Sequence, residues 1–301
     1  MIEGTALDHV SLAVEHIEEA WPFFIGELGG QWKSGGPNVG FAASQLLFSN
    51  NAKLEFLEPY NPEENPFLRR FLDRHGEGPH HITFIVPDLL DALEQLKAFG
   101  MQPIGINLDN PFWKEAFLHP VEAFGIVIQV AQSAGEWVTD PPAKLPNPRV
   151  SHPAALISAA LVVDNLAAAK HFFMDLLGGE IRATTITPEG VTIDLAWHDS
   201  PLVLRLLGRG DNGEGARAIR DYLGHLPGKL SHLEFSAPQL PEVDSVDIAD
   251  SMLIGYSPGE QNNSTDTLIT KFVGTTVVVY QKANDRPATH QAEKSASHED
   301  S

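Results

Sequence analysis

Three residues on separate strand-like segments carry the side chains that a divalent metal needs. His9 lies in DHVSLAV, Glu55 in KLEFLEP and His81 in HHITFIV. Two imidazoles and one carboxylate suit a borderline ion such as Zn, Ni, Co, Mn or Fe, and an open coordination position would make that ion a Lewis acid. Spacing alone does not establish such a site, because a single histidine in a strand is more often a structural or surface residue.

The alternation of side chains along each strand tests these candidates, because residues two apart share a face. His9 and Ser11 lie on a small, polar face, and the apolar residues around them lie on the other. GIVIQVAQ adds a fourth polar position, Gln129, whereas the same alternation places His80 on the opposite face from His81. Four strands therefore each offer one polar residue on the face that points away from the apolar side.

The segments that would position these residues recur along the chain. FFIGELGG from Phe23 returns as FFMDLLGG from Phe172, and HHITFIVP from His80 matches SHLEFSAP from Ser231. GIVIQVAQ likewise matches GTTVVVYQ. Matches in the same order at a nearly constant offset indicate two homologous halves.

Within the first half, hydrophobic periodicity predicts two smaller units, each with a strand, a helical stretch and further strands. The predicted strands are 8–14, 39–48, 52–58, 80–86, 102–107, 114–118 and 125–131, and the helical stretches are 17–28 and 88–99. Pro22 falls within the first helical stretch, so that helix is expected to be kinked or to begin later. Strands and helices in this order indicate an α+β fold.

Shifts in composition mark the boundaries between the halves. Residues 133–154 contain DPPAKLPNP, which is too rich in proline for helix or strand and suits a semi-rigid linker. Residues 1–132 and 155–282 are therefore expected to be the two domains. Residues 283–301 are polar and lack periodicity, so we expect a disordered tail there.

Charge and composition narrow the class of protein. The 40 acidic and 20 basic residues give a formal net charge of -20, which repels nucleic acid and anionic membranes. Cysteine is absent, which excludes disulfides, cysteine-bound metals and a thiol nucleophile. With neither an export signal nor an apolar run long enough to span a membrane, we expect a cytoplasmic monomer or homodimer that binds a small molecule.

Longer motifs around these residues resemble the vicinal oxygen chelate superfamily, which includes glyoxalases, bleomycin resistance proteins and extradiol dioxygenases. LDHVSLAV, KLEFLEP, FLDRHGEGPHHITFIV and EAFLHPVEAFGIVIQV are most similar to its methylmalonyl-CoA epimerase branch and cover most of residues 7–132. The resemblance implies tandem paired βαβββ modules that form open β-cups, a glyoxalase-like fold. It also implies one divalent metal with a ligand from each of four strands, here His9, Glu55, His81 and Gln129.

Gln129 departs from the family pattern, which usually has a glutamate there that binds the metal and, in epimerases, accepts a proton. A glutamine oxygen can still bind a metal, but the amide cannot accept a proton. The expected catalytic base is therefore another carboxylate, first Glu55 and with less support Glu58 or Glu122.

Two further residues are candidates for substrate binding. His119 belongs to the family's loop pattern, although Pro120 could equally make it a turn residue. Trp113 could line an apolar pocket mouth, although core packing is the commoner role for such a side chain.

The second half carries different residues at the positions that match the ligands. Ser158, Arg205, His232 and Val278 stand there, so only one histidine is retained. A second metal site is therefore not expected. We interpret this half as a degenerate second domain in which His232 is a structural residue.

Together these features predict a metal-dependent enzyme that acts on a small carbonyl or acyl substrate through an enolate-like intermediate, as an epimerase, isomerase or glyoxalase-type lyase. Two alternatives stay open: a non-catalytic protein that sequesters a small molecule in the same cup, and an oxygenase that uses Fe(II). Catalysed solvent exchange into a substrate would distinguish the enzyme from the binding protein, and dependence on iron and oxygen would reveal the oxygenase.

Overall fold

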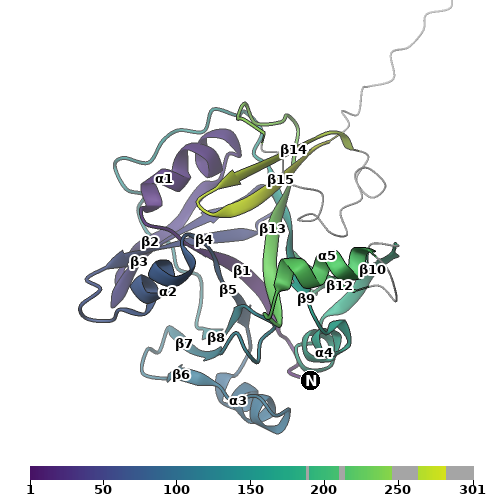
Figure 1. The fold of residues 1–301 in the computed structure, drawn as a ribbon. Helices are drawn as coiled ribbons and strands as arrows, with labels where there is room; N and C mark the ends of the chain where they lie inside the picture. Colours follow the sequence, from purple (N-terminus) through teal and green to yellow (C-terminus); the bar gives the residue numbers. More distant parts are fainter. Residues whose placement is uncertain (188–189, 210–213, 246–263, 283–301) are drawn as a thin grey trace, which may run out of the picture.

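Two curved, mixed β-sheets, one from each half of the chain, form the body of the protein (Figure 1). The computed structural model describes residues 1–187, 190–209, 214–245 and 264–282. The tail predicted at 283–301 lies outside these described residues. No helix among them is long and apolar enough to cross a membrane.

The first sheet places two βαβββ units side by side. Its elements are β1 (Ala6–Ala13), α1 (Ile17–Trp21), the π-helical turn η1 (Pro22–Glu27), β2 (Gln31–Asn38), β3 (Gly40–Leu47), β4 (Lys53–Tyr60), α2 (Phe67–His75), β5 (Gly78–Ile85), α3 (Leu89–Ala98), β6 (Ile104–Asn107), β7 (Trp113–Leu118) and β8 (Val127–Ser133). The strand order is β2-β3-β4-β1-β5-β8-β7-β6. β1 pairs in parallel with β4 and antiparallel with β5, and β5 pairs in parallel with β8. This topology confirms the predicted α+β, glyoxalase-like fold.

The second sheet repeats this topology with fewer elements. They are β9 (Ala155–Val163), α4 (Leu166–Lys170), the π-helical turn η2 (His171–Leu176), β10 (Glu180–Ile186), β11 (Val191–Ala196), β12 (Val203–Gly208), α5 (Glu214–Leu223), β13 (Gly228–Ala237), β14 (Ser264–Phe272) and β15 (Thr275–Lys282). The strand order is β10-β11-β12-β9-β13-β15-β14. β9 lies between β12 and β13 as β1 lies between β4 and β5. Counterparts of α3 and β6 are not found in the described part of this half.

The first helix changes its hydrogen-bond pattern at Pro22, where α1 gives way to η1. Pro22 occupies the first position of this π-helical turn, so the predicted irregularity is present. The second half makes the same change at His171, which follows α4 without a proline. The π-helical turn is therefore a property of the fold, and Pro22 is tolerated in it rather than causing it.

β2 is an edge strand that periodicity did not predict. It contains Gly35, Gly36 and Pro37, all poor strand formers, and none of its residues is buried. It pairs antiparallel with β3 alone, and an edge strand tolerates such residues because one side of its backbone needs no partner strand.

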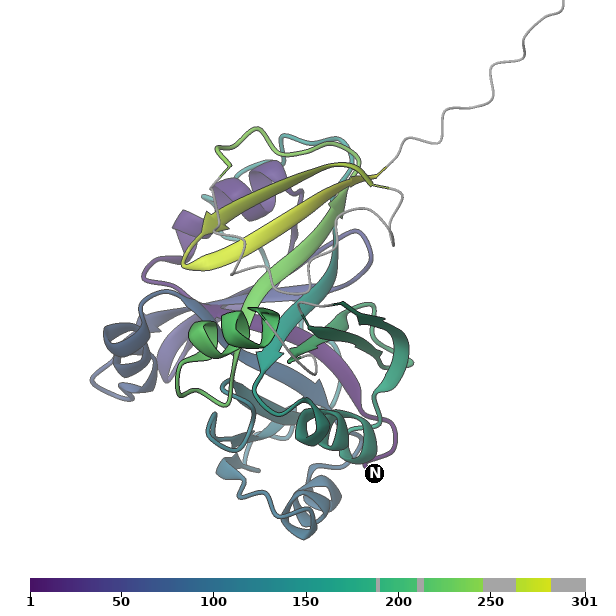
Figure 2. The same ribbon diagram turned by 45° about the vertical axis from the view of Figure 1, so that its right-hand side comes forward.

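The two sheets share one apolar core, to which each half contributes the aromatic pair of its π-helical turn. Phe24 packs near Phe235 of the second sheet, and Phe173 packs near Phe84 of the first, which is the reciprocal contact. Figures 1 and 2 both show α1 beside β14 and β15. Each helix thus covers strands of the other half as well as its own.

Two glycine contacts bring the backbones of the halves together. A Cβ on Gly125, at φ +82°, would overlap the carbonyl of Gly228, and a Cβ on Gly274, at φ +69°, would overlap that of Glu77, next to Gly78. Gly125 matches Gly274 in the repeat, and Glu77 matches Gly228. The contacts are therefore reciprocal, like those of a two-fold symmetric dimer.

Candidate metal centre

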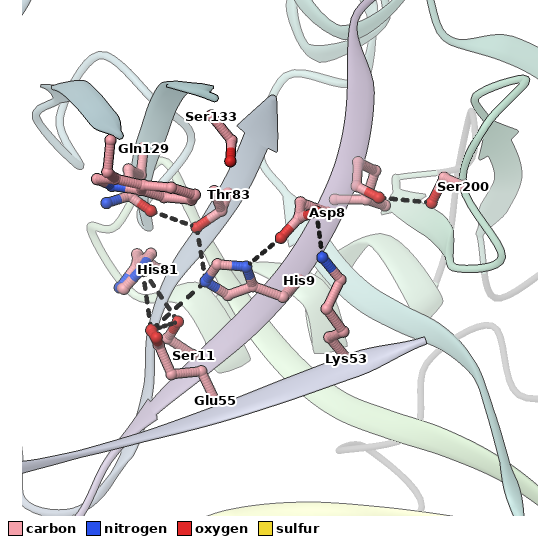
Figure 3. A network of polar contacts seen from close by, with 12 residues as sticks. Asp8, His9, Ser11, Lys53, Glu55, His81, Thr83, Gln129, Ser133 and Ser200 are labelled. Carbon is pink, nitrogen blue, oxygen red and sulfur yellow. Dashed lines mark hydrogen bonds and ion pairs between the residues drawn. The ribbon is translucent and has the colours of Figure 1, made fainter. Parts of the chain in front are cut away.

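The three predicted ligands come from adjacent strands of the first sheet. His9 lies on β1, Glu55 on β4 and His81 on β5, with β1 in the middle. Ser11 on β1 is opposite both Glu55 and His81 in the strand registers, so these side chains share one face, which we name the N-terminal cup. One ligand atom from each of the three residues lies within 4.8 Å of the others (Figure 3).

The spacing of these atoms fits a divalent metal. His9 Nε2 lies 3.4 Å from Glu55 Oε2, and His81 Nε2 lies 3.8 Å from the same oxygen. Atoms bound at about 2.0–2.2 Å to one ion are roughly 3.0–3.5 Å apart, so the distance from His9 to Glu55 has this spacing and the distance from His81 to Glu55 is slightly longer. Ser11 Oγ donates to Glu55 Oε2 at 2.6 Å and lies 3.0 Å from His81 Nε2, which holds the two ligands at this spacing.

Each of the two histidines predicted as ligands has its outer ring nitrogen held by the residue before it. Asp8 Oδ2 lies 2.7 Å from His9 Nδ1, and Lys53 Nζ donates to Asp8 Oδ1 at 2.5 Å. His80 Nδ1 lies 2.8 Å from His81 Nδ1. These contacts leave Nε2 of both ligands facing the cup, and such outer partners fix the orientation of metal-binding imidazoles.

His80 lies on the same side of the sheet as His81, which corrects the prediction from strand alternation. Ser11 is opposite His81, but the next residue of β1 is opposite Pro79, so the register skips His80. This β-bulge lets two consecutive side chains point the same way, and His80 packs against aromatic rings of α2. A second bulge, at Asp8, brings that carboxylate to its histidine.

The charges in the cup favour a proton on His9 and an ionised Glu55. Burial alone would lower the pKa of His9, but Glu55 and then Asp8 outweigh it and raise the pKa to about 9. Burial alone would raise the pKa of Glu55, but His9 lowers it to about 2. A divalent ion would displace the proton of His9, because a histidine ligand must be neutral.

Gln129, the fourth predicted ligand, reaches the cup beside His9. Thr83 Oγ1 donates to Gln129 Oε1 at 2.6 Å and lies 3.0 Å from His9 Nε2 (Figure 3). Gln129 on β8 is opposite Thr83 on β5 in the strand register. The amide oxygen is therefore one hydroxyl away from a ligand nitrogen.

Glu115 is a carboxylate of the cup that the sequence analysis missed. Its Oε2 accepts hydrogen bonds from Gln129 Nε2 at 2.7 Å and from Trp113 Nε1 at 2.9 Å. Burial, with a further contribution from the charge of Glu55, raises the pKa of the Glu115 carboxyl above its usual value. The alternation within the predicted strand 114–118 puts Glu115 on one face, but only the pairing of β7 with β8 identifies that face as the cup.

The other acids considered as bases make backbone contacts away from the ligands. Glu58 accepts a hydrogen bond from the N–H of Ile17 at 2.7 Å, at the start of α1. Glu122 accepts one from the N–H of Gln102 at 3.0 Å. Neither carboxylate is part of the hydrogen-bonded network around the ligands.

The two predicted substrate-binding residues differ in position. Trp113 lies in the cup, where its indole holds Glu115. His119 is exposed, and its Nδ1 accepts a hydrogen bond from the N–H of Val121 at 3.3 Å in a turn. Substrate binding by either residue stays a prediction.

The corresponding face of the second sheet, which we name the C-terminal cup, has a matching register. The residues that lie opposite one another on β9, β12, β13 and β15 occupy the same relative positions as those on β1, β4, β5 and β8. The residues at the ligand positions are Ser158, Arg205, His232 and Val278. Among the described residues, His9, Glu55 and His81 form the only cluster of three or more potential metal-binding side chains.

An ion-pair network fills the C-terminal cup. Arg205 binds Asp194 with Nε at 2.7 Å and Glu234 with Nη1 at 2.5 Å. Tyr280 Oη donates to Glu234 at 2.9 Å, and His232 Nε2 lies 3.4 Å from the same carboxylate. Burial alone would raise the pKa of Glu234, but His232 and Arg205 lower it to about 2. A guanidinium therefore stands where the N-terminal cup would hold a metal.

Comparison with known proteins shows which family and which relatives the N-terminal half is similar to. Residues 8–116 match the family model of the Glyoxalase/Bleomycin resistance protein/Dioxygenase superfamily. Human mitochondrial methylmalonyl-CoA epimerase is 27% identical over 131 residues, 42% of this chain and 73% of that protein. Ethylmalonyl-CoA/methylmalonyl-CoA epimerase of Cereibacter sphaeroides is 28% identical over 131 residues, 42% of this chain and 96% of that protein.

One solved structure is similar across both halves. A mutant of 4-hydroxymandelate synthase from Streptomyces coelicolor superposes with a TM-score of 0.54 and 16% identity, over 78% of this chain and 71% of that one, which shows a common fold. The family match at residues 8–116 shows a domain of the Glyoxalase/Bleomycin resistance protein/Dioxygenase superfamily in the N-terminal half, and the structural similarity shows that the fold is shared across both halves.

Proposed function

We propose that the protein is an enzyme that binds one divalent metal in the N-terminal cup and moves a proton at the carbon next to a carbonyl group. The observation that carries this proposal is the cluster of His9, Glu55 and His81, whose donor atoms lie within 4.8 Å of one another, close to the spacing that one ion requires. The substrate class is a small acyl or carbonyl compound, and the epimerase relatives suggest an acyl-CoA thioester.

The metal would be held by His9, Glu55 and His81, with Gln129 as a fourth ligand. When bound, it would supply positive charge that stabilises the oxygen of an enolate-like intermediate. The cup residues contribute orientation, since Asp8 and the bulged His80 fix the ligand imidazoles.

The proton acceptor in this proposal is a carboxylate of the cup. The sequence favoured Glu55, but its pKa near 2 and its contacts with both histidines suit a ligand better than a base. Glu115 has a raised pKa, and its hydrogen bonds in the described structure go to Oε2. Its Oε1 is therefore the oxygen that we assign to proton transfer: it would take the proton from the α-carbon, and the electron pair left behind would move onto the carbonyl oxygen.

Deuterium exchange tests the proposed reaction. Methylmalonyl-CoA in D₂O, with protein reconstituted with Zn²⁺, Co²⁺ or Mn²⁺, should gain deuterium at the α-carbon, and chelation of the metal should stop the exchange. His81→Ala should be inactive, whereas the matched change His232→Ala in the C-terminal cup should retain activity. Stabilisation of the protein by a ligand, with no exchange into methylmalonyl-CoA or 2-oxo acids under any of these metals, would instead support a sequestering protein.

A second candidate is an oxygenase that uses Fe(II). Two histidines and one carboxylate on one face are also the ligand set of non-haem iron oxygenases, which keep open positions for substrate and oxygen. Activity that requires both Fe(II) and oxygen would favour this reaction, whereas exchange that proceeds without oxygen would favour proton transfer.

A further inference from the structure

The amide of Gln129 differs from a carboxylate in having two unlike ends. Its oxygen can bind a metal, whereas its NH₂ group can only donate hydrogen bonds. A glutamate could present either of two equivalent oxygens, so its orientation would not matter. A glutamine ligand must turn its amide oxygen toward the metal, and neighbouring residues must hold it in that orientation.

The neighbours of Gln129 select one orientation. Its Nε2 donates to Glu115 Oε2 at 2.7 Å, and its Oε1 accepts from Thr83 Oγ1 at 2.6 Å on the side of His9. An ionised carboxylate has no hydrogen to donate, so it can face only the NH₂ end. The reversed amide would set two oxygens against each other at this distance.

Glu115 is itself held in place. Trp113 Nε1 donates to the same Oε2 at 2.9 Å, and both residues lie on β7, the strand that pairs with β8. In the register, Glu115 is opposite Ala131, the next residue on the same face of β8 as Gln129. The carboxylate is thus positioned by the backbone and by an indole, independently of the histidine ligands.

We propose that Glu115 is a positioning residue that selects the metal-binding orientation of the Gln129 amide. The inference rests on the proposed function, because it presumes a metal in the N-terminal cup. It explains how this chain keeps a fourth ligand without a glutamate on β8. A carboxylate stands instead on the neighbouring strand, where it would act on the metal through the amide.

Titration of the metal-free protein with Co²⁺, followed by the visible absorption of the bound ion, tests this proposal without any substrate. Glu115→Gln keeps the shape of the side chain but removes the charge-assisted bond and the preference for the NH₂ end. Co²⁺ binding should weaken about 10-fold to 100-fold, the usual range for loss of such an outer partner. An affinity within twofold of the wild type would overturn the proposal.

The exchanged pair Glu115→Gln/Gln129→Glu separates orientation from packing. The glutamate on β8 could then bind the ion with either oxygen, and the glutamine on β7 could donate to it. Affinity for Co²⁺ should return to the wild-type value or exceed it. A double variant as weak as Glu115→Gln would show that Glu115 acts through packing, and the proposal would fail.

Two controls distinguish a failure of this inference from a failure of the proposed function. Glu122→Gln makes the same chemical change at an acid that accepts a hydrogen bond from the N–H of Gln102, away from the cup, and should leave Co²⁺ affinity unchanged. If the wild type binds no Co²⁺, both the proposed function and this inference fail. If His9→Ala abolishes binding while Glu115→Gln does not weaken it, the metal site stands and only this inference fails.

Discussion

The N-terminal cup has His9 and Glu55 where the C-terminal cup has Ser158 and Arg205, on strands with the same pairing and the same register. In the first cup, the carboxylate lies within 3.4 Å and 3.8 Å of two imidazole nitrogens. In the second, a guanidinium is bound between two carboxylates. Both cups therefore pair carboxylates with a positive charge. In the N-terminal cup that charge is a proton on His9, which a metal ion could replace, whereas in the C-terminal cup it is the guanidinium of Arg205.

This difference shows how one backbone can make either a binding site or a structural element. His9 balances Glu55 with a proton, which a metal can displace. Arg205 balances Asp194 and Glu234 with a covalently attached charge that cannot leave. We infer that the second cup supports the architecture, while the first carries the chemistry.

The largest expected effect is a difference in metal content between variants of His81 and His232, which occupy matching positions in the repeat. His81→Ala removes a ligand nitrogen and should reduce metal content from about one ion per chain to none after dialysis against a weak chelator. His232→Ala should leave the metal content unchanged. Elemental analysis of the two variants measures this directly, and equal losses in both would remove the distinction between the cups.

Arg205→Ala should have the largest effect on folding. It leaves the buried carboxylates of Glu234 and Asp194 without their guanidinium partner, and breaking such a pair costs about 3–5 kcal/mol. Chemical denaturation should report this loss, while Co²⁺ affinity in the other cup stays the same. Arg69→Ala, which breaks a surface ion pair, is the matched control and should change stability little. A stable Arg205→Ala variant that binds a second metal would contradict our view of this cup.

Gly125→Ala tests whether the two cups belong to one packed body. A Cβ there would collide with Gly228 across the contact between the halves, and overpacking of this kind costs about 1–3 kcal/mol. Gly76→Ala provides the control, because Gly76 has a similar φ of +71° but nothing within 4 Å of the added carbon. The difference between their denaturation midpoints isolates the contact. No difference would show that the halves are not held together at Gly125.

A change of pH, without any substitution, should also change the metal affinity. Because the pKa of His9 is raised to about 9 in the metal-free cup, binding between pH 6 and pH 8 must release a proton. Affinity should therefore rise roughly tenfold for each pH unit and level off above about pH 9. The carboxyl of Glu55, with its pKa near 2, stays ionised across this range and adds no slope. Calorimetric titrations in buffers of different ionisation heat would measure the proton, and a pH-independent affinity would contradict the charge assignment.

Much of the fold and of the candidate site could be predicted from the sequence, because alternation in strands and an internal repeat can both be read directly from the order of residues. Period-two alternation put His9 and Ser11 on one face, and the ordered repeat identified Ser158 and Arg205 as the counterparts of His9 and Glu55.

The features that could not be predicted depend on pairing between strands that are distant in the sequence. Alternation fails at a β-bulge, and no local signal marks the one at His80. β2 was missed because Gly35, Gly36 and Pro37 give it no apolar period. Glu115 was missed because the face that it occupies is defined only by the register of β7 on β8.

An anomalous difference map from crystals soaked in Zn²⁺ tests the central claim most directly, because it shows both cups in one experiment. We expect a single strong peak in the N-terminal cup, about 2.0–2.2 Å from Nε2 of His9 and His81 and from a carboxylate oxygen of Glu55. The C-terminal cup should show no peak at Arg205. An empty N-terminal cup, or a peak of equal height among Arg205, His232 and Glu234, would contradict the account.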